Sequence, residues 1–388
     1  MKILHCCLAA FYIDDAGYQE NILPRIHQGQ GHEVEIVAST ETYIDNKALG
    51  YIAPGSYNNS DGILVTRLPY ISWLPHVVAK KVRSYRGLTE VLSRFKPDIL
   101  FLHNCQFWDV GSIIAYKRKN PEVKIFVDGH SDFINSATTW ISKHLLHGVL
   151  YRYCTKRIEP HVEKFFGVLP ARVDFFTQMY GVSPDKTALL VLGADDTIIN
   201  WDQADQIRRR LRAEWGVQED DFVLIAGGRI DRRKQFIDLL KAVKNIDRSN
   251  VKLILFGTPV PDVEAEITPL LDQPAVTHLG WVKSEAVYDF FLAADLGVFP
   301  GTHSVIWEQA IGTGLPALFR RWPGMDHVDV GGNCKFFESG TEQEVIDQVR
   351  QIVDSQEEFQ KMKNAAMELG VPEFSYSQIA LRAIGHLP

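Results

Sequence analysis

The sequence is poor in cysteine, and its cysteines follow no pairing pattern. Five cysteines occur in 388 residues, an odd number, and no two of them have Cys-x-x-Cys spacing. Disulfide frameworks and zinc ribbons need paired, regularly spaced cysteines. The spacing therefore excludes a small domain that is held together by disulfides or by zinc. We therefore predict free, buried thiols in a reducing compartment.

Long apolar runs are also missing. No stretch approaches the ~20 apolar residues that a membrane-spanning helix needs. The amino-terminal run MKILHCCLAAFYIDD has a short apolar core and no small-residue cleavage site, so it predicts a first β-strand rather than a signal peptide. These absences predict a cytoplasmic protein.

Positive charge is not in excess. The chain has 41 Lys and Arg against 48 Asp and Glu, a formal net charge of −7, whereas dedicated nucleic-acid binders are usually basic. There is no Gly-x-x-x-x-Gly-Lys-[Ser/Thr] run, so a P-loop is not supported. Acidic pairs such as Asp195-Asp196 are scattered and form no recognisable metal-ligand set. We expect neither a nucleic-acid partner nor a bound metal.

What the chain does contain is a regular alternation of β-prone apolar runs and helical patterns. The run from 222 to 226 ends in Gly227-Gly228, and a helical stripe follows at core-facing spacing (Phe236, Leu239, Leu240, Val243). Such alternation is typical of parallel sheets flanked by helices. The predicted fold class is therefore α/β with Rossmann-like parallel sheets.

The length suggests two domains. We expect a first α/β domain over residues 1–195, a second over 196–370, and a terminal helical segment, 371–388, that packs back on the first. Within the first domain, the Asn-, Gly-, Ser- and Pro-rich residues 41–62 predict a long loop. Residues 76–95 predict one amphipathic helix.

Candidate site residues follow the predicted strand ends, where ligands bind in parallel α/β sheets. Gly228, Arg229 and Lys234 lie in a Gly-rich turn between strand and helix, where two cations and the backbone amides could converge on a diphosphate. The alternative is a solvated turn that happens to be basic.

A second candidate group lies in the segment GTHSVIWEQAIGTGLP. Thr302, His303 and Ser304 are predicted to cap a helix whose amino terminus attracts anions. Glu308 could accept hydrogen bonds from ribose hydroxyls, or could be an exposed helix carboxylate.

Basic and histidine residues of the first half offer further candidates. His130 follows a strand and could act on a hydroxyl or hold a sugar, or could be a loop histidine hydrogen-bonded locally. Basic helical patterns near 80–94 and 144–157 could contact an anionic membrane face or a phosphorylated acceptor, or could be solvated helix faces.

These motifs resemble the retaining glycosyltransferases of family 4, which have the GT-B architecture of two Rossmann-like domains facing across a cleft. GGRIDRRK is similar to the family's Gly-Arg…Lys diphosphate element, and LGWVKSEAVYDFFLAADLGVFP to its nucleobase-side segment. WEQAIGTGLPAL is similar to its Glu-containing helix with a Gly-x-Pro end. The first half resembles the family more loosely, through MKILH, GYQEN and VDGH.

The resemblance implies a role for each matching residue. Arg229 and Lys234 would neutralise the leaving diphosphate, and His130 would contact the transferred sugar; these three are the predicted catalytic residues. Glu308 would hold the ribose. The remaining predicted donor-binding residues are Gly17, Gly228, Trp281, Val282, Thr302, His303 and Ser304.

One position departs from the family pattern. Where the family usually has a first glutamate, separated from its second motif glutamate by seven intervening residues, this chain has Pro300. His303 and the backbone around Ser304 are candidates to replace it.

The resemblance therefore implies a retaining, metal-independent glycosyltransferase without a cofactor. It would move a hexose-type sugar from a nucleotide-diphosphate donor, UDP first and GDP second, to a saccharide or lipid-linked acceptor in surface polysaccharide or glycoconjugate biosynthesis. Peripheral contact with the inner membrane face fits that role. Two alternatives stay open: a nucleotide-sugar epimerase, and a non-catalytic sugar-nucleotide-binding protein.

Overall fold

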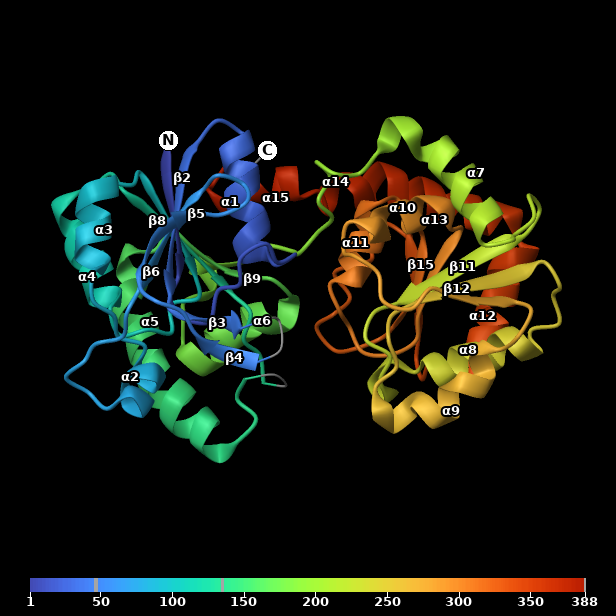
Figure 1. Ribbon diagram of the computed structural model, residues 1–388, viewed down its shortest axis with the longest axis horizontal. Coiled ribbons are helices and arrows are strands. Elements are labelled where there is room, and N and C mark those ends of the chain that lie inside the picture. The colour runs from blue at the N-terminus through green and yellow to red at the C-terminus, as the bar shows by residue number, and fades with distance from the viewer. Residues whose placement is uncertain (45–47, 134–135, 387–388) are drawn as a thin grey trace. The chain divides into compact units, whose positions relative to one another are not determined.

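The computed structural model describes residues 1–44, 48–133 and 136–386 and divides the chain into two compact units (Figure 1). The first unit comprises Met1–Val191 and Ile379–Pro388, and the second comprises Leu192–Gln378. The chain thus passes between the units near residue 191 and returns to the first unit inside its last helix.

The first unit is built on a sheet with the strand order β10-β9-β8-β7-β1-β2-β6-β5. All neighbouring strands pair in parallel except β5, which is antiparallel to β6. The direction of winding reverses between β1 and β7, which makes their carboxyl ends a topological switch point. The strands are β1 Lys2–Cys7, β2 Glu33–Ser39, β5 Gly55–Asn58, β6 Leu64–Leu68, β7 Ile99–His103, β8 Lys124–Gly129, β9 Lys164–Gly167 and β10 Thr187–Leu189.

Helices cover this sheet because the parallel strands are apolar on both faces. In Figure 1, α3 and α4 pack against each other at the left of the first unit, and α1 and α15 lie at its right. The helical segments are α1 Gln19–Gly29, α2 His76–Val82, α3 Leu88–Phe95, α4 Val110–Lys119, η1 Ser142–Tyr151 (a π-helix), α5 Arg152–Ile158, η2 Glu159–His161, α6 Pro170–Phe175, η3 Phe176–Tyr180 and η4 Pro184–Lys186.

Two secondary-structure predictions for this unit are wrong. Residues 41–62 are not one long loop, because β3 (Glu41–Ile44) pairs with β4 (Ala48–Tyr51) in a hairpin and β5 joins the main sheet. Part of the predicted loop, residues 45–47, lies outside the described residues. The polar composition predicted turns but hid strands that are largely exposed to solvent.

The second wrong prediction is the single helix over 76–95. Arg83 and Gly87 both have positive φ, at 56° and 102°, so the chain leaves the helix after α2 and starts again at α3. Positive φ is costly for a non-glycine residue such as Arg83. The Arg83 guanidinium offsets this cost by donating to the carbonyl of Gln106 and lying over the ring of Tyr151.

The second unit has a fully parallel sheet in the order β13-β12-β11-β14-β15-β16. Its winding reverses between β11 and β14, a second switch point. The strands are β11 Phe222–Gly227, β12 Val251–Phe256, β13 Val276–His278, β14 Leu296–Phe299, β15 Ala317–Arg320 and β16 Cys334–Phe337.

Helices lie on both faces of this sheet, with α7 and α10 on one side and α8, α9 and α12 on the other (Figure 1). The stripe Phe236, Leu239, Leu240 and Val243 is buried, as its spacing predicts. The helical segments are η5 Trp201–Gln203, α7 Ala204–Glu214, η6 Arg232–Lys234, α8 Phe236–Asn245, α9 Pro261–Leu271, α10 Ala286–Ala293, α11 Ile306–Gly312, α12 Glu342–Asp354, α13 Gln356–Ala365, η7 Ala366–Gly370, α14 Val371–Glu373 and α15 Tyr376–Ala383.

The last helix, α15, crosses the division between the units. Its residues from Ile379 onward belong to the first unit, where Ile379, Ala380, Ala383 and Ile384 are almost fully buried. All five cysteines are buried free thiols, which confirms the prediction that the thiols are free and buried. Among the described residues, none of the helices combines the length and the apolar character needed to cross a bilayer.

Candidate functional site

The switch point of the second unit collects the residues predicted from strand ends. β11 leads directly into Gly228 and Arg229, and the neighbouring strand β14 leads into Pro300 and Gly301. A ligand bound at the carboxyl edge of this sheet would lie against these two turns.

The turns at this edge are packed too closely for side chains larger than hydrogen. Gly228 has a φ of 112°, and a Cβ on the adjacent Gly257 would lie 1.8 Å from the carbonyl oxygen of Gly228. A Cβ on Gly301 would lie 2.3 Å from the carbonyl oxygen of Arg233. These glycines let the backbones of three turns approach one another and fix the cationic turn against the loop after β14.

The four cations of that turn are not equivalent. Arg233 pairs with Asp231 at 2.6 Å and Arg232 with Glu266 at 3.0 Å. Arg229 is 71% exposed, and its Nε lies 3.9 Å from Asp231 Oδ2. Arg229 is therefore the guanidinium that is most readily turned toward an anionic ligand.

Lys234 is held differently. Its Nζ donates to the carbonyl oxygens of Thr302, at 2.6 Å, and His303, at 3.1 Å. Burial lowers the pKa of Lys234 to about 8. The ammonium thus ties the cationic turn to the loop after β14 and lies in a partly dry setting where an added negative charge would stabilise it.

The prediction that Thr302, His303 or Ser304 caps the next helix is wrong. α11 begins at Ile306 with Val305 as its N-cap, and within the described chain no side chain caps it. The Thr302 and His303 carbonyls instead accept from Lys234, and the Ser304 carbonyl accepts from the amide of Trp307. The loop therefore contacts Lys234 through its backbone carbonyls.

Glu308 is fully buried, so the alternative of an exposed helix carboxylate does not hold. Its Oε1 accepts from His303 Nε2 at 2.7 Å and from His327 Nε2 at 2.8 Å. Burial alone would raise the pKa of Glu308, but the two imidazoles outweigh it and hold that pKa well below its usual range. Oε2 has no hydrogen-bond partner among the described residues.

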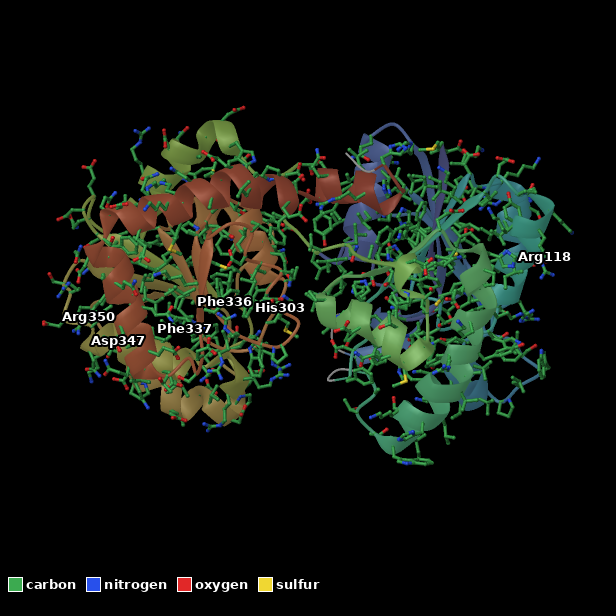
Figure 2. All side chains as sticks on the ribbon, turned by 180° about the vertical axis from the view of Figure 1, so that it is seen from behind. Arg118, His303, Phe336, Phe337, Asp347 and Arg350 are labelled. Atoms are coloured by element: carbon green, nitrogen blue, oxygen red, sulfur yellow. The ribbon has the colours of Figure 1, made fainter. Side chains whose placement is uncertain are left out.

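His303 is labelled in Figure 2, on the loop between β14 and α11. Its partner in holding Glu308, His327, is absent from the sequence-based prediction. His327 lies in the irregular segment between β15 and β16, where no periodicity marks it. The sequence feature that points to His327 is its position after a β-prone run, which is the same feature that marks the other turns of this edge.

Trp281 and Val282 follow β13, in the next turn along this edge. The Gly280 carbonyl accepts from the Gly257 amide at 2.6 Å, which joins their turn to that of Gly228. Trp281 is 74% exposed and Val282 is half-buried. The structure therefore brings Gly228, Arg229, Lys234, Trp281 and the 302–308 segment to one edge of one sheet.

The two remaining candidates, Gly17 and His130, belong to the first unit. Gly17 lies in the exposed loop before α1, and His130 directly follows β8. His130 Nε2 lies 3.5 Å from Oδ2 of the buried Asp128, which also accepts from His103 Nδ1 at 2.8 Å. Burial lowers the pKa of His130, but Asp128 outweighs it, so that pKa is raised. His103 ends the neighbouring strand β7, and the sequence-based prediction missed it.

Two groups of side chains have metal-ligand geometry. Ligand atoms of Glu20, His103 and His130 lie within 4.8 Å of one another, as do those of His303, Glu308 and His327. In the first group, both ring nitrogens of His103 already take part in hydrogen bonds. In the second, the two imidazole protons occupy the place that a cation would take. Hydrogen bonds therefore already engage His103 in the first group and all three side chains of the second.

Residues 207–369 match the family model for glycosyl transferases group 1. The matched residues make up most of the second unit, which is therefore similar to the group 1 glycosyl transferases. The lipopolysaccharide core biosynthesis glycosyltransferase LpsD of Rhizobium meliloti is 26% identical over 172 residues, which are 42% of this chain and 50% of LpsD. The matched segment thus spans half the length of that relative.

Solved structures resemble the whole chain, beyond the residues that match the family model. HepE from Anabaena in complex with UDP has a TM-score of 0.68 at 15% identity, covering 98% of each chain. A glycosyltransferase from Rickettsia africae has a TM-score of 0.67 at 12% identity, covering 98% of this chain and 96% of its own. HepE with UDP-glucose has a TM-score of 0.62 at 16% identity, covering 99% and 98%. The fold is therefore GT-B.

Proposed function

We propose that the protein is a retaining glycosyltransferase that moves a hexose-type sugar from a nucleotide-diphosphate donor to a saccharide or lipid-linked acceptor. The observation that carries this proposal is the exposed Arg229 in the same turn as the half-buried Lys234, at the switch point of a unit that is similar to group 1 glycosyl transferases. The family match and LpsD support a role in surface polysaccharide or glycoconjugate biosynthesis.

The cations explain how the donor bond would break. Cleavage of a sugar–phosphate bond builds negative charge on the leaving diphosphate and positive charge on the sugar ring. Fixed cations at the diphosphate stabilise this transition state without reorganising. Arg229 and Lys234 supply that charge, so we propose that no metal is required. Activity should persist in EDTA, and an activity that EDTA abolishes and a divalent cation restores would contradict this mechanism.

The remaining residues of this edge would orient the nucleotide. Trp281 and Val282 would lie against the base, and Gly228 and the backbone of Thr302, His303 and Ser304 would border the phosphates. Oε2 of Glu308 would accept from a ribose hydroxyl. Because this oxygen is covered in the ligand-free fold, ribose binding requires its neighbours to move.

Residues of the first unit would serve the sugar. His130 would contact the transferred sugar, and Gly17 would let its loop approach the diphosphate. UDP is the favoured carrier and GDP the second, because the similar protein HepE binds UDP and UDP-glucose.

The decisive test compares two arginines of the same turn. Arg229→Ala should weaken UDP binding roughly 10- to 100-fold, since hydrogen bonds to charged groups contribute about 1.5–3 kcal/mol. The control Arg232→Ala removes a guanidinium that pairs with Glu266 and should bind UDP normally. Thermal shift in a UDP, GDP and ADP series, with sugar transfer, measures both. Normal binding and turnover in Arg229→Ala would overturn the diphosphate assignment.

A peripheral contact with the cytoplasmic face of a membrane is part of the proposal. The chain has no Asp or Glu from 62 to 89 or from 133 to 158, although its net charge is −7. These stretches pack together, since Tyr151 donates to the carbonyl of Lys81 and the Arg83 guanidinium lies over the Tyr151 ring. Exposed Trp140, Ile141, Leu145 and Val149 lie among their cations. Aromatic, aliphatic and basic side chains together suit an anionic bilayer surface.

A further inference from the structure

A continuous chain of buried hydrogen bonds runs through the first unit from its last helix to Asp128. His27 Nε2 lies 2.9 Å from the carbonyl oxygen of Ala380, and His27 Nδ1 lies 3.1 Å from His5 Nε2. His5 Nδ1 lies 3.1 Å from His103 Nε2, and His103 Nδ1 lies 2.8 Å from Asp128 Oδ2. The three imidazoles and Asp128 are each at most 2% exposed.

The two ends of this chain fix how many protons it holds. A carbonyl oxygen and a carboxylate oxygen both accept, so every gap in the chain needs one proton from a ring nitrogen. The chain has four gaps: one at each end and two between rings. Three neutral imidazoles carry only three protons. The fourth gap therefore requires one additional proton.

The position of that proton follows from the charge of Asp128. Hydrogen-bond directions alone would let any one of the three rings carry it, but His103 is the ring that contacts Asp128 Oδ2. With the extra proton on His103, its Nδ1 donates to Asp128 and its Nε2 donates to His5 Nδ1. His5 Nε2 then donates to His27 Nδ1, and His27 Nε2 donates to Ala380. A protonated His103 beside an ionised Asp128 leaves the buried chain with zero net charge, which minimises its desolvation cost.

We propose that the Ala380 carbonyl, through His27 and His5, holds His103 as an imidazolium, and that this chain positions the charge of Asp128 for His130. The role assigned to His130 rests on the proposed function, since that is where His130 contacts the sugar. His27, His5 and His103 are positioning residues, because none of them faces the sugar in this proposal.

The pKa values agree with this assignment of protons. Burial and the neighbouring imidazoles hold the pKa of His5 well below its usual range, and burial lowers that of His27 to about 4, so both stay neutral. Burial raises the pKa of Asp128, but His103 and His130 outweigh it and the net direction is downward, so Asp128 stays ionised.

Other titratable groups face both ends of the chain. Glu20 of α1 lies within 4.8 Å of His103 and His130, and Arg172 and Asp132, which form an ion pair at 3.3 Å, are near His130. The Cys7 thiol on β1 stays protonated, because burial raises its pKa. At the other end, His32 lies beside His27, and the amino terminus and His386 influence the pKa of His32.

The proposal predicts how the pKa of His130 changes when the hydrogen-bond chain is interrupted. Without His27, two neutral rings fill the two remaining gaps, His5 to His103 and His103 to Asp128. His103 then loses its extra proton, and Asp128 attracts a proton to His130 without competition. The ring nitrogens of His103 and His130 lie within 4.8 Å, a separation at which one unit charge shifts a pKa by roughly 1 unit or more.

The test is nitrogen-15 NMR of the histidine rings in the full-length protein. At pH 8, where an ordinary imidazole is neutral, His103 should show two protonated nitrogens, while His5 and His27 should show protonated Nε2 and bare Nδ1. A neutral His103 would overturn the proposal. This measurement needs no substrate, so its result is independent of whether the protein transfers a sugar.

A variant pair tests the consequence for His130. His27→Phe should raise the pKa of His130, read from its ring carbon resonances, by roughly 1 unit or more, and the pH profile of turnover should move with it. The control His32→Gln changes a neighbouring imidazole outside the chain and should leave both unchanged. An unshifted His130 in folded His27→Phe would contradict the positioning role, whereas a shift without any sugar transfer would contradict only the proposed function.

Discussion

At the scale of single residues, the site is assembled from charges whose neighbours fix their protonation. Glu308 stays ionised although it is buried, because two imidazoles donate to one of its oxygens. Lys234 is the reverse case, since burial lowers its pKa and its partners are uncharged carbonyls. Loss of His327 would leave the buried Glu308 Oε1 with one donor instead of two, and a buried carboxylate with fewer partners is destabilising.

Lys234 makes the proposed donor site sensitive to pH. Below its pKa of about 8 the ammonium is charged and can neutralise a diphosphate; above it the amine is neutral. UDP affinity should therefore be constant below pH 8 and fall by up to about tenfold per pH unit above it. Calorimetric titration with UDP between pH 7 and 9.5 measures this dependence.

Lys234→Arg is the matched control, because a guanidinium stays charged throughout this range. Its UDP affinity should vary much less with pH. The same decline in Lys234→Arg as in the wild-type protein would show that another group is responsible. The unliganded wild-type protein should also become more stable as the pH rises from 8 toward 10, since a lysine with a lowered pKa loses its desolvated charge there.

The sequence predicted the site residues that belong to a recognisable strand–turn–helix pattern. It missed the residues that lie outside such a pattern. Arg229 follows β11 closely, and Lys234 and Glu308 lie in the turn and helix that come after β11 and β14, so the strand-end rule finds them. His103 and His327 act through Asp128 and Glu308, which lie 25 and 19 positions away in the sequence. No periodicity encodes such a pairing, because it depends on the order of strands in the folded sheet.

At the scale of elements, the break between α2 and α3 and the π-helix η1 shape the basic face of the first unit. Periodicity predicted helix in both places, but it does not register a single residue with positive φ such as Arg83. The same limit explains the missed strands in residues 41–62, where turn-forming residues dominate the composition. Local patterns gave the type of long, apolar elements reliably and failed on short, polar ones.

The basic face, formed by the described residues within 62–89 and 133–158, is the surface that we propose contacts a membrane, and its exposed aliphatic side chains allow a test. Wild-type protein should co-sediment with phosphatidylglycerol vesicles, less so in high salt. Leu145→Ser combined with Val149→Ser should weaken binding about tenfold or more, because burying each aliphatic side chain contributes about 1.5–3 kcal/mol. Leu189→Ser, a change at another exposed leucine of the same unit, is the control. Equal binding of all three proteins would contradict docking through η1.

At the scale of the whole molecule, the two parallel sheets follow from the alternation of strands and helices, and the boundary between the units does not. The sequence placed the second domain at 196–370, whereas the structure passes from one unit to the other at residue 191 and again inside α15. The sequence predicted that the terminal segment packs on the first domain, but a helix pattern is the same on either side of a division. The residue at which α15 passes into the first unit is given only by the buried contacts of Ile379, Ala380 and Ile384.

Removing residues 379–388 should therefore destabilise the first unit and spare the second. The deletion exposes the surface that Ile379 and Ile384 cover, which costs about 1.5–3 kcal/mol for each isoleucine, and leaves His27 without its acceptor. Calorimetry should show one transition moved to lower temperature, and the other should still shift upward with UDP. Loss of the UDP response would instead mean that the deletion damages the second unit.

The hydrogen bond from His27 to Ala380 joins residues 353 positions apart. During synthesis, the sheet of the first unit emerges early, and domains generally fold in order from the amino terminus. Residues 379 onward, which belong to the first unit, are however made only after the whole of the second unit. The second unit can complete its fold while the first still lacks the segment that covers α1, so the part of the protein that is translated first is the part that is finished last.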